Sequence, residues 1–478
     1  MYNECKRLLI DARGRIELRT FANPEEKRIY LTEQPVPGLV MEMAIPSIIS
    51  MLITSFYNMA DTFFVGRIGT SATAAVGVVF PLMSIIQALG FTFGHGSGNF
   101  ISRALGKGDV DSARRMATTG FFSAMIAGAV FGAVCLLFLR GVVNLLGATA
   151  TIAPYARDYA RFILIGTPFM CASLVLNNQL RFQGSAFYGM IGMGAGAVLN
   201  IALDPLFIFV LKMGVAGAAL ATIISQTVSF CLLLRGCTRG GNIAIHPREF
   251  KPSWAIYKEI IRGGTPSLFR QGLGSVATIC LNYAAGIYGD AAIAGMSIVT
   301  RVLMFANSAV IGLGQGFQPV CGFNYGARRF DRVRKAFWFT VALGFCVLVV
   351  FCTVGIIAAP EVISIFRKED LEVIRIGALS LRLQCIVYPF TAFIVGANML
   401  LQTIGKPVRA SVVAASRNGL FFVPAILILP QILGLLGVQI SQMVADILSL
   451  GLSIPLVFGT MREMKRMQAQ DELSGGQQ

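Results

Sequence analysis

The sequence predicts an all-α polytopic membrane protein, with twelve transmembrane helices in two six-helix lobes related by an internal repeat. The 478-residue chain is 55% hydrophobic and only 13% charged, with a mean hydropathy of +0.69. Apolar runs of about 20 residues, each long enough to cross a bilayer as a helix, recur along the whole length. The chain also repeats itself after about 220 residues. These observations exclude an ordinary soluble protein and a disordered chain.

Twelve candidate spans follow one another from the amino to the carboxy end. We expect them at 40–64, 73–98, 117–139, 159–180, 187–210, 214–235, 264–287, 292–318, 337–359, 376–401, 408–430 and 434–458. An even number of spans leaves both termini on the same side of the membrane. The predicted organisation is a basic leader (1–36), an amino-terminal lobe (37–235), a linker (236–262), a carboxy-terminal lobe (263–460) and a tail (461–478).

The distribution of lysine and arginine predicts which side holds the termini. Of 40 such residues, 28 lie on the side of the termini and nine lie in the opposite loops, while Arg270, Arg301 and Arg417 fall within spans. Short loops rich in these residues stay in the cytoplasm. We therefore expect a multi-pass protein of the inner (plasma) membrane with both termini cytoplasmic. The net charge of +16 belongs to these loops, so no nucleic-acid partner is expected.

The internal repeat consists of glycines and prolines that recur at a nearly constant offset. A shift of 220 places Pro46 on Pro266, Gly94 and Gly96 on Gly314 and Gly316, and Gly106 on Gly326. Six spans return the chain to its starting side, so the two lobes have the same orientation. Paired repeats of this kind usually place a substrate path at their interface. The glycines at 94–98 are not followed by Gly-Lys-Ser/Thr, which favours close helix packing over a phosphate loop.

Two aspartates, Asp61 and Asp204, lie inside apolar runs, where a carboxylate is costly and usually has a function. Potential partners are Tyr57 and Asn200, each four residues earlier on the same helix face. Thr222 in the sixth span lies at a similar depth, in the outer half, whereas Asn177 in the fourth span counts as deeper. The sequence therefore predicts a polar site in the amino-terminal lobe.

Such a cluster suits a proton relay or a sodium site. Low dielectric disfavours the charged form of a carboxyl group, so it can load and release a proton near neutral pH. Carboxylate, hydroxyl and amide oxygens can instead bind sodium at Asp61 and Asp204. Structural alternatives stay open: Asp61 could end its span near Gly66-Arg67, and Asp204, followed by Pro205, could belong to a kink.

The second repeat lacks these acids, since Leu281 and Pro424 occupy the matching positions. It carries instead the three arginines within spans and one acid, Asp446, which could pair with Arg417 across the last two helices. This asymmetry suggests that coupling ions are handled in the first half of the chain.

Five segments together resemble one transporter family. They are Ala60–Gly69, Ile101–Asp109, Asn200–Pro205, Gln315–Pro319 and Asn324–Arg328. The joint set is similar to that of the multidrug and toxic compound extrusion (MATE) family, in its bacterial MepA-like branch, over roughly residues 36 to 460. No single segment would be specific.

The resemblance implies a V-shaped bundle with a central cavity and an alternating-access antiporter. It would export organic cations or amphiphilic drugs in exchange for protons or sodium, and so contribute to antibiotic resistance. By position, the family's amino-lobe cation site matches Asp61, with Tyr57, Asn177, Asn200, Asp204 and Thr222, and Pro46 matches a proline that bends the first helix. The acids that another branch places in helices seven and ten are missing from the spans of this chain.

Other functional classes fit less well. A lipid-linked oligosaccharide flippase is the main alternative, because arginines in a cavity would suit pyrophosphate groups. An intramembrane enzyme would need a nucleophile–base pair or a metal cluster, and the sequence offers neither. We expect no cofactor beyond the coupling ion, drug-like small molecules and the lipid bilayer as partners, and a monomer.

Overall fold

The computed structural model describes residues 21–366 and 370–475, and throughout these ranges the regular secondary structure is helical. The amino-terminal half contains α1 (Pro24–Glu33), α2 (Val36–Gly66), α3 (Thr70–Lys107), α4 (Val110–Leu137), α5 (Leu139–Leu145), α6 (Ala153–Phe182), α7 (Ala186–Pro205) and α8 (Gly214–Cys237). The carboxy-terminal half contains α9 (Trp254–Gly286), α10 (Asp290–Gly326), α11 (Phe330–Ile357), α12 (Ala359–Phe366), α13 (Leu371–Val387), α14 (Thr391–Thr403), α15 (Pro407–Ala415), α16 (Phe422–Leu433) and α17 (Leu435–Gly475).

Short irregular helices complete the described chain. Of two five-residue π-helices, η1 (Leu206–Val210) forms the end of the fifth predicted span and η4 (Ser416–Leu420) interrupts the eleventh. Single 3₁₀ turns lie in the linker, as η2 (Pro247–Glu249), and in the tenth span, as η3 (Tyr388–Phe390).

The predicted spans correspond to these helices in order. Among the described residues, 11 helical stretches are long and apolar enough to cross a membrane. The predicted span at 264–287 lies in α9, which is 33 residues long but is not one of the 11. The sequence of α9 includes Arg262, Arg270 and Gln271, which make this helix more polar than the other spans.

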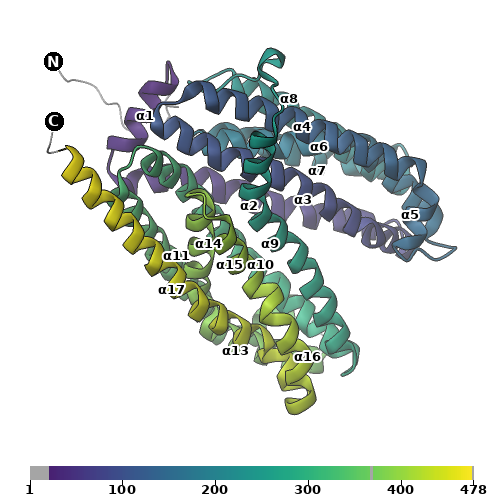
Figure 1. The fold of residues 1–478 in the computed structure, drawn as a ribbon. Coiled ribbons are helices and arrows are strands. Elements are labelled where there is room, and N and C mark those ends of the chain that lie inside the picture. Colours follow the sequence, from purple (N-terminus) through teal and green to yellow (C-terminus); the bar gives the residue numbers. More distant parts are fainter. Residues whose placement is uncertain (1–20, 367–369, 476–478) are drawn as a thin grey trace, which may run out of the picture.

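The two halves of the chain form two lobes that diverge from a shared end, and this gives the molecule a V shape (Figure 1). Helices α2 to α8 build one lobe and α9 to α17 build the other. Both described ends of the chain lie where the lobes meet, which we call the vertex. The opposite side, where the lobes are apart, is called the open end.

Glycines related by the repeat bring the lobes together at the vertex. A Cβ added to Gly106 would lie 2.2 Å from the backbone oxygen of Phe323, and one added to Gly326 would lie 2.2 Å from that of Arg103. Both glycines and both oxygens are related by the same shift of 220. The repeat in the sequence is therefore a pseudo-twofold relation in space, with backbone packed directly on backbone.

The glycines at 94–98 serve the same purpose, as predicted. A Cβ at Gly96 would lie 2.1 Å from the backbone oxygen of Ile260 on α9, and one at Gly98 would lie 2.2 Å from the ring of Phe182 on α6. Close helix packing thus explains this glycine-rich stretch.

Helix α1, which lies within the predicted leader, covers the vertex and contacts both lobes. It begins at Asn23, whose side chain caps the first turn. The ammonium group of Lys27 donates to Ser185 Oγ at 2.9 Å and to Asn242 Oδ1 at 2.7 Å on the amino-terminal side. Asn324 of α10 donates to the backbone oxygen of Leu31 at 3.0 Å. Contacts from one short helix therefore hold the two lobes together at this end.

Candidate functional site

The buried carboxylate of Asp204 sits at the end of α7 and faces α8. Asp204 is fully buried, and Asn200 and Thr222 are each 1% exposed. In the better-satisfied orientation of its amide, Asn200 donates to Asp204 Oδ2 at 3.1 Å and accepts from the Thr222 backbone N–H at 3.2 Å. The other orientation also joins Asn200 to the same two residues. The structure thus brings these three predicted residues together.

Helix α2 supplies the second carboxylate to the same place. Asp61 and Asp204 are close enough to interact electrostatically, and the Tyr57 hydroxyl interacts with Thr222 and with both carboxylates. Asp61 Oδ1 is buried and has no hydrogen-bond partner among the described residues. The site therefore contains a carboxylate oxygen that is shielded from water and free to bind a proton or a cation.

Tyr159 of α6 belongs to this cluster and was not among the predicted residues. It is 1% exposed and interacts electrostatically with Asp61, Tyr57 and Asp204. Its hydroxyl lies 3.8 Å from Met83 Sδ. The sequence offered no clear signal for it, because Tyr159 stands between Arg157-Asp158 and Arg161 at the start of its predicted span.

Asn177 also lies on α6, but away from the carboxylates of Asp61 and Asp204. Its amide nitrogen would be 3.0 Å from a Cβ at Gly189 of α7. Gly189 precedes Asp204 by 15 residues, about 22 Å along a helix. The structure therefore separates Asn177 from the cluster at Asp61 and Asp204, and any role for it in ion binding remains a prediction.

The structural alternatives for the two acids can be compared with their surroundings. Helix α2 continues to Gly66, so Asp61 lies inside the helix and does not cap its end. The chain does change helix type just after Asp204, since Pro205 ends α7 and η1 follows. Even so, the Asp204 carboxylate bonds to the Asn200 side chain and not to the turn.

Pro46 lies inside α2 and is half-buried near the vertex. The Ser50 hydroxyl donates to the backbone oxygen of Pro46 at 2.9 Å. A proline inside a helix cannot donate a backbone hydrogen bond, so α2 is weakened at this point. Bending of α2 at Pro46 remains a prediction.

The carboxy-terminal lobe contains the ion pair that the sequence suggested. Arg417, in the π-helix η4, donates to Asp446 Oδ1 through Nε at 2.8 Å and to Oδ2 through Nη2 at 3.4 Å. Gln442 also donates to Asp446 Oδ1 at 2.9 Å, and the guanidinium lies 5.5 Å from the ring centroid of Tyr388. Asp446 is thus fully occupied by neighbouring donors.

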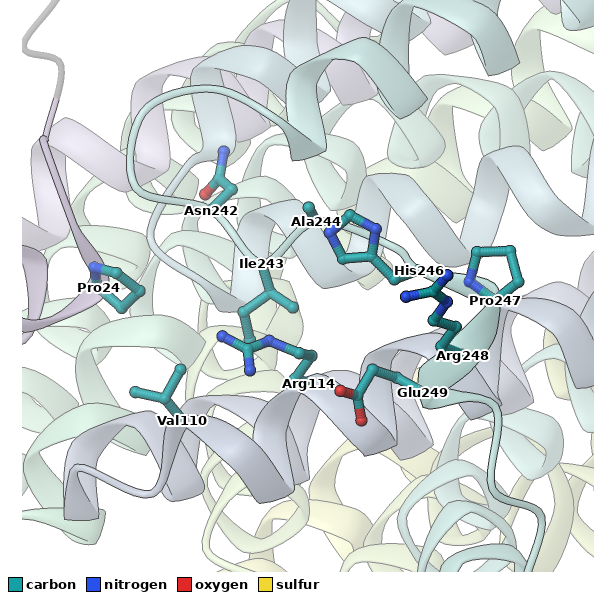
Figure 2. Close-up of a pocket in the computed structure, with 10 residues that line it drawn as sticks. All are labelled: Pro24, Val110, Arg114, Asn242, Ile243, Ala244, His246, Pro247, Arg248 and Glu249. Atoms are coloured by element: carbon teal, nitrogen blue, oxygen red, sulfur yellow. The ribbon is translucent and has the colours of Figure 1, made fainter.

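A separate pocket opens near the vertex, between the linker and α4 (Figure 2). It has a volume of about 660 Å³, and its polar lining includes Arg114, His246, Arg248 and Glu249. None of the predicted site residues lines it, so it is distinct from the carboxylate cluster.

Comparison with known proteins agrees with the fold and the repeat. The family model MatE matches the chain twice, over residues 46–206 and 266–427. The multidrug export protein MepA of Staphylococcus haemolyticus (strain JCSC1435) is 26% identical over 442 residues, which cover 91% of this chain and 96% of that protein.

Two solved structures are equally similar. One is described as the outward-facing conformation of a multidrug resistance MATE family transporter of the MOP superfamily; it has a TM-score of 0.87 and 26% identity and covers 94% of this chain and 100% of its own. The other, MATE in complex with MaL6, has a TM-score of 0.87 and 26% identity, with coverage of 92% and 99%. These relatives are transporters and not enzymes, in agreement with the sequence. Because the family model matches well over half of its length, the chain belongs to the MatE family of membrane transporters.

Proposed function

We propose that this protein is a secondary active multidrug exporter, which expels drug-like amphiphilic compounds in exchange for protons or sodium by alternating access. The observation that carries the proposal is the buried, unpartnered oxygen of Asp61 beside the buried carboxylate of Asp204. Two neighbouring carboxylates in low dielectric cannot both stay charged without a bound cation. A proton or a sodium ion bound there neutralises them, and its release restores the repulsion.

The position of this site suits coupling. Asp61 and Asp204 lie on helices α2 and α7, toward their open ends. Helix α2 also packs against α10 at the vertex, where a Cβ at Gly316 would lie 2.4 Å from Ala44 Cα. A change in charge at one end of α2 can therefore alter how its other end packs, and Pro46 lies within the packed stretch, since a Cβ at Gly312 would lie 2.6 Å from Ile48 Cα. An ion that prefers one state and a drug that prefers the other would exchange across the membrane.

The membrane orientation belongs to the same proposal. The excess of lysine and arginine on the side of the termini supports a cytoplasmic vertex in the plasma membrane. With this orientation, the state in which the lobes are joined at the vertex is open to the outside. The named relatives, which are multidrug export proteins, support export as the direction of transport. We expect the chain to act as a monomer.

The proposal is tested in proteoliposomes in which pH and sodium gradients are imposed separately. The dyes are ethidium, rhodamine B and the methyl ester of rhodamine B, so that the result does not depend on the charge of one substrate. We expect Asp61→Asn and Asp204→Asn each to reduce gradient-driven dye export at least about tenfold, which corresponds to about 1.4 kcal/mol. Asp158→Asn, which changes an exposed acid at the open end of α6, is the matched control.

Normal gradient-driven export by both variants would refute the role of the carboxylates. Failure of the unaltered protein to move any of the dyes under either gradient would refute the exporter itself. The gradient that drives export identifies the coupling ion.

A further inference from the structure

Two arginines in the membrane-spanning part of the carboxy-terminal lobe have no counter-charge among the residues that the structure describes. Of its three intramembrane arginines, Arg417 is neutralised by Asp446 at 2.8 Å. No described residue offers Arg270 or Arg301 an ion pair or a side-chain hydrogen bond. The acid that α9 does carry, Glu259, is already paired with Arg103 at 2.6 Å. An unpaired charge in such a position is unfavourable, so a functional ligand is the default hypothesis.

Arg301 lies on the face of α10 that meets the amino-terminal lobe. On this face Ser308 contacts Ser55 of α2 at 3.2 Å, and the Phe305 ring lies 5.9 Å from that of Phe56. Arg301 is four residues before Phe305 and seven before Ser308, so it continues the same face toward the open end. Its side chain is exposed.

Arg270 occupies the corresponding face of α9. Gly263, seven residues earlier, packs against α3, where its added Cβ would lie 3.1 Å from Gly96 Cα. Arg270 interacts electrostatically with His95 and Arg181 of the amino-terminal lobe. Its charge is therefore near a second group of polar and charged residues in the amino-terminal lobe.

These donors are also uncompensated. Arg181 is 4% exposed, and its Nη2 donates to Asn178 Oδ1 at 2.6 Å and to His95 Nε2 at 3.3 Å. A guanidinium has donors only, so Nε2 of His95 must accept, and Nδ1 donates to the backbone oxygen of Phe91 at 3.2 Å. Arg181 Nε is buried with no partner among the described residues. No carboxylate from the described part of the chain is paired with this group.

We propose that the inner faces of the two lobes bind an anionic group of the transported compound, a carboxylate or a phosphate, at Arg270, with Arg181 adding positive charge at the vertex end and Arg301 extending the positive surface toward the open end. This inference rests on the proposed export function and specifies its substrate class. The guanidinium fork matches the geometry of both anions, and a charge-assisted pair of this kind is stronger than a neutral hydrogen bond. Substrates would thus be zwitterionic or anionic amphiphiles, and purely cationic compounds would be repelled.

The test measures equilibrium binding to the purified full-length protein in nanodiscs of phosphatidylcholine. Rhodamine B and its methyl ester are suitable probes, because they differ only in whether the carboxylate is free. We expect rhodamine B to bind at least about tenfold more tightly than the ester, Arg270→Gln to remove most of this difference, and Arg301→Gln to reduce it. Arg140→Gln, at an exposed position on α5, is the control and should retain it.

The outcomes separate this inference from the export proposal. Equal binding of the acid and the ester, or a preference that survives both substitutions, overturns the anion site and leaves the exporter intact. The expected binding without gradient-driven export overturns the exporter and supports the site. Phosphatidylglycerol in the nanodiscs identifies the source of the anion: if it displaces rhodamine B from the unaltered protein only, a lipid headgroup also occupies the arginine site.

Discussion

The packing of backbone on backbone at the vertex leads to a prediction about the balance between conformations. A Cβ at Gly106 or Gly326 would lie 2.2 Å from a backbone oxygen of the other lobe, whereas ordinary contact begins at 3.4 Å. The shortfall is about 1.2 Å in each case. Because the obstacle is backbone, no side chain can rotate away. Gly106→Ala or Gly326→Ala therefore requires the lobes to separate at the vertex by about this distance.

The free-energy cost falls only on the state that is closed at the vertex. Overpacking a close contact costs about 1–3 kcal/mol. A state that opens at the vertex does not contain the contact and avoids the cost. The equilibrium should then shift by roughly 5- to 150-fold toward that state. The two substitutions should act alike, because the pseudo-twofold relation makes their surroundings equivalent.

Double electron–electron resonance measures this shift directly. Spin labels at Arg115→Cys on α4 and Lys335→Cys on α11 report the separation of the lobes, since both side chains are exposed near the vertex and related by the repeat. The background must lack reactive native cysteines. We expect longer distances to gain population in both alanine variants. Gly66→Ala is the control, because a Cβ there meets nothing within 4 Å. Unchanged distance distributions in the two vertex variants would refute the packing argument.

Two further predictions concern stability. Asp446→Asn leaves Arg417 buried without a counter-charge and should lower the free energy of unfolding by about 3–5 kcal/mol, which is measured as a lower thermal unfolding midpoint. The Arg417→Met/Asp446→Leu double variant removes both charges and should be more stable than Asp446→Asn. If the two variants were equally unstable, this reasoning would be contradicted. Burial at the vertex lowers the pKa of Lys27 from 10.5 to about 7. Between these two pH values the unfolded chain therefore binds more protons than the folded chain. The free energy of unfolding should rise by roughly 1.4 kcal/mol per pH unit from pH 7 toward pH 10. This increase should disappear in Lys27→Met and persist in Lys258→Met, which changes an exposed lysine; a slope common to both variants would show that other groups cause it.

The architecture was largely predictable because it depends on features that are local in the sequence. Span positions follow from the length of apolar runs, and the repeat follows from glycines and prolines at a constant offset. The same glycines then proved to mark backbone contacts, since only glycine allows backbones to approach so closely. The predicted span in α9 is not one of the 11 stretches that are apolar enough to cross a membrane, because this helix carries Arg270.

Residue partnerships could be predicted only where they lie within one helix or follow from charge. The spacing of four residues placed Asn200 beside Asp204, and opposite charge suggested the pair of Arg417 and Asp446. Spacing does not specify how neighbouring helices are rotated or how far they slide along each other. For this reason Tyr159 was missed and Asn177 was grouped with carboxylates from which it is well separated.

By itself, the sequence determined the membrane class, the helix order, the duplicated lobes and the two intramembrane acids, because hydrophobic length and the cost of a buried charge act locally. Only the tertiary structure decided which charges are neutralised. Asp446 takes up the charge of Arg417, whereas among the described residues Asp61 Oδ1 has no hydrogen-bond partner and Arg270 has no ion pair. The difference arises from distances between side chains on separate helices, which depend on packing across the whole fold and not on sequence spacing.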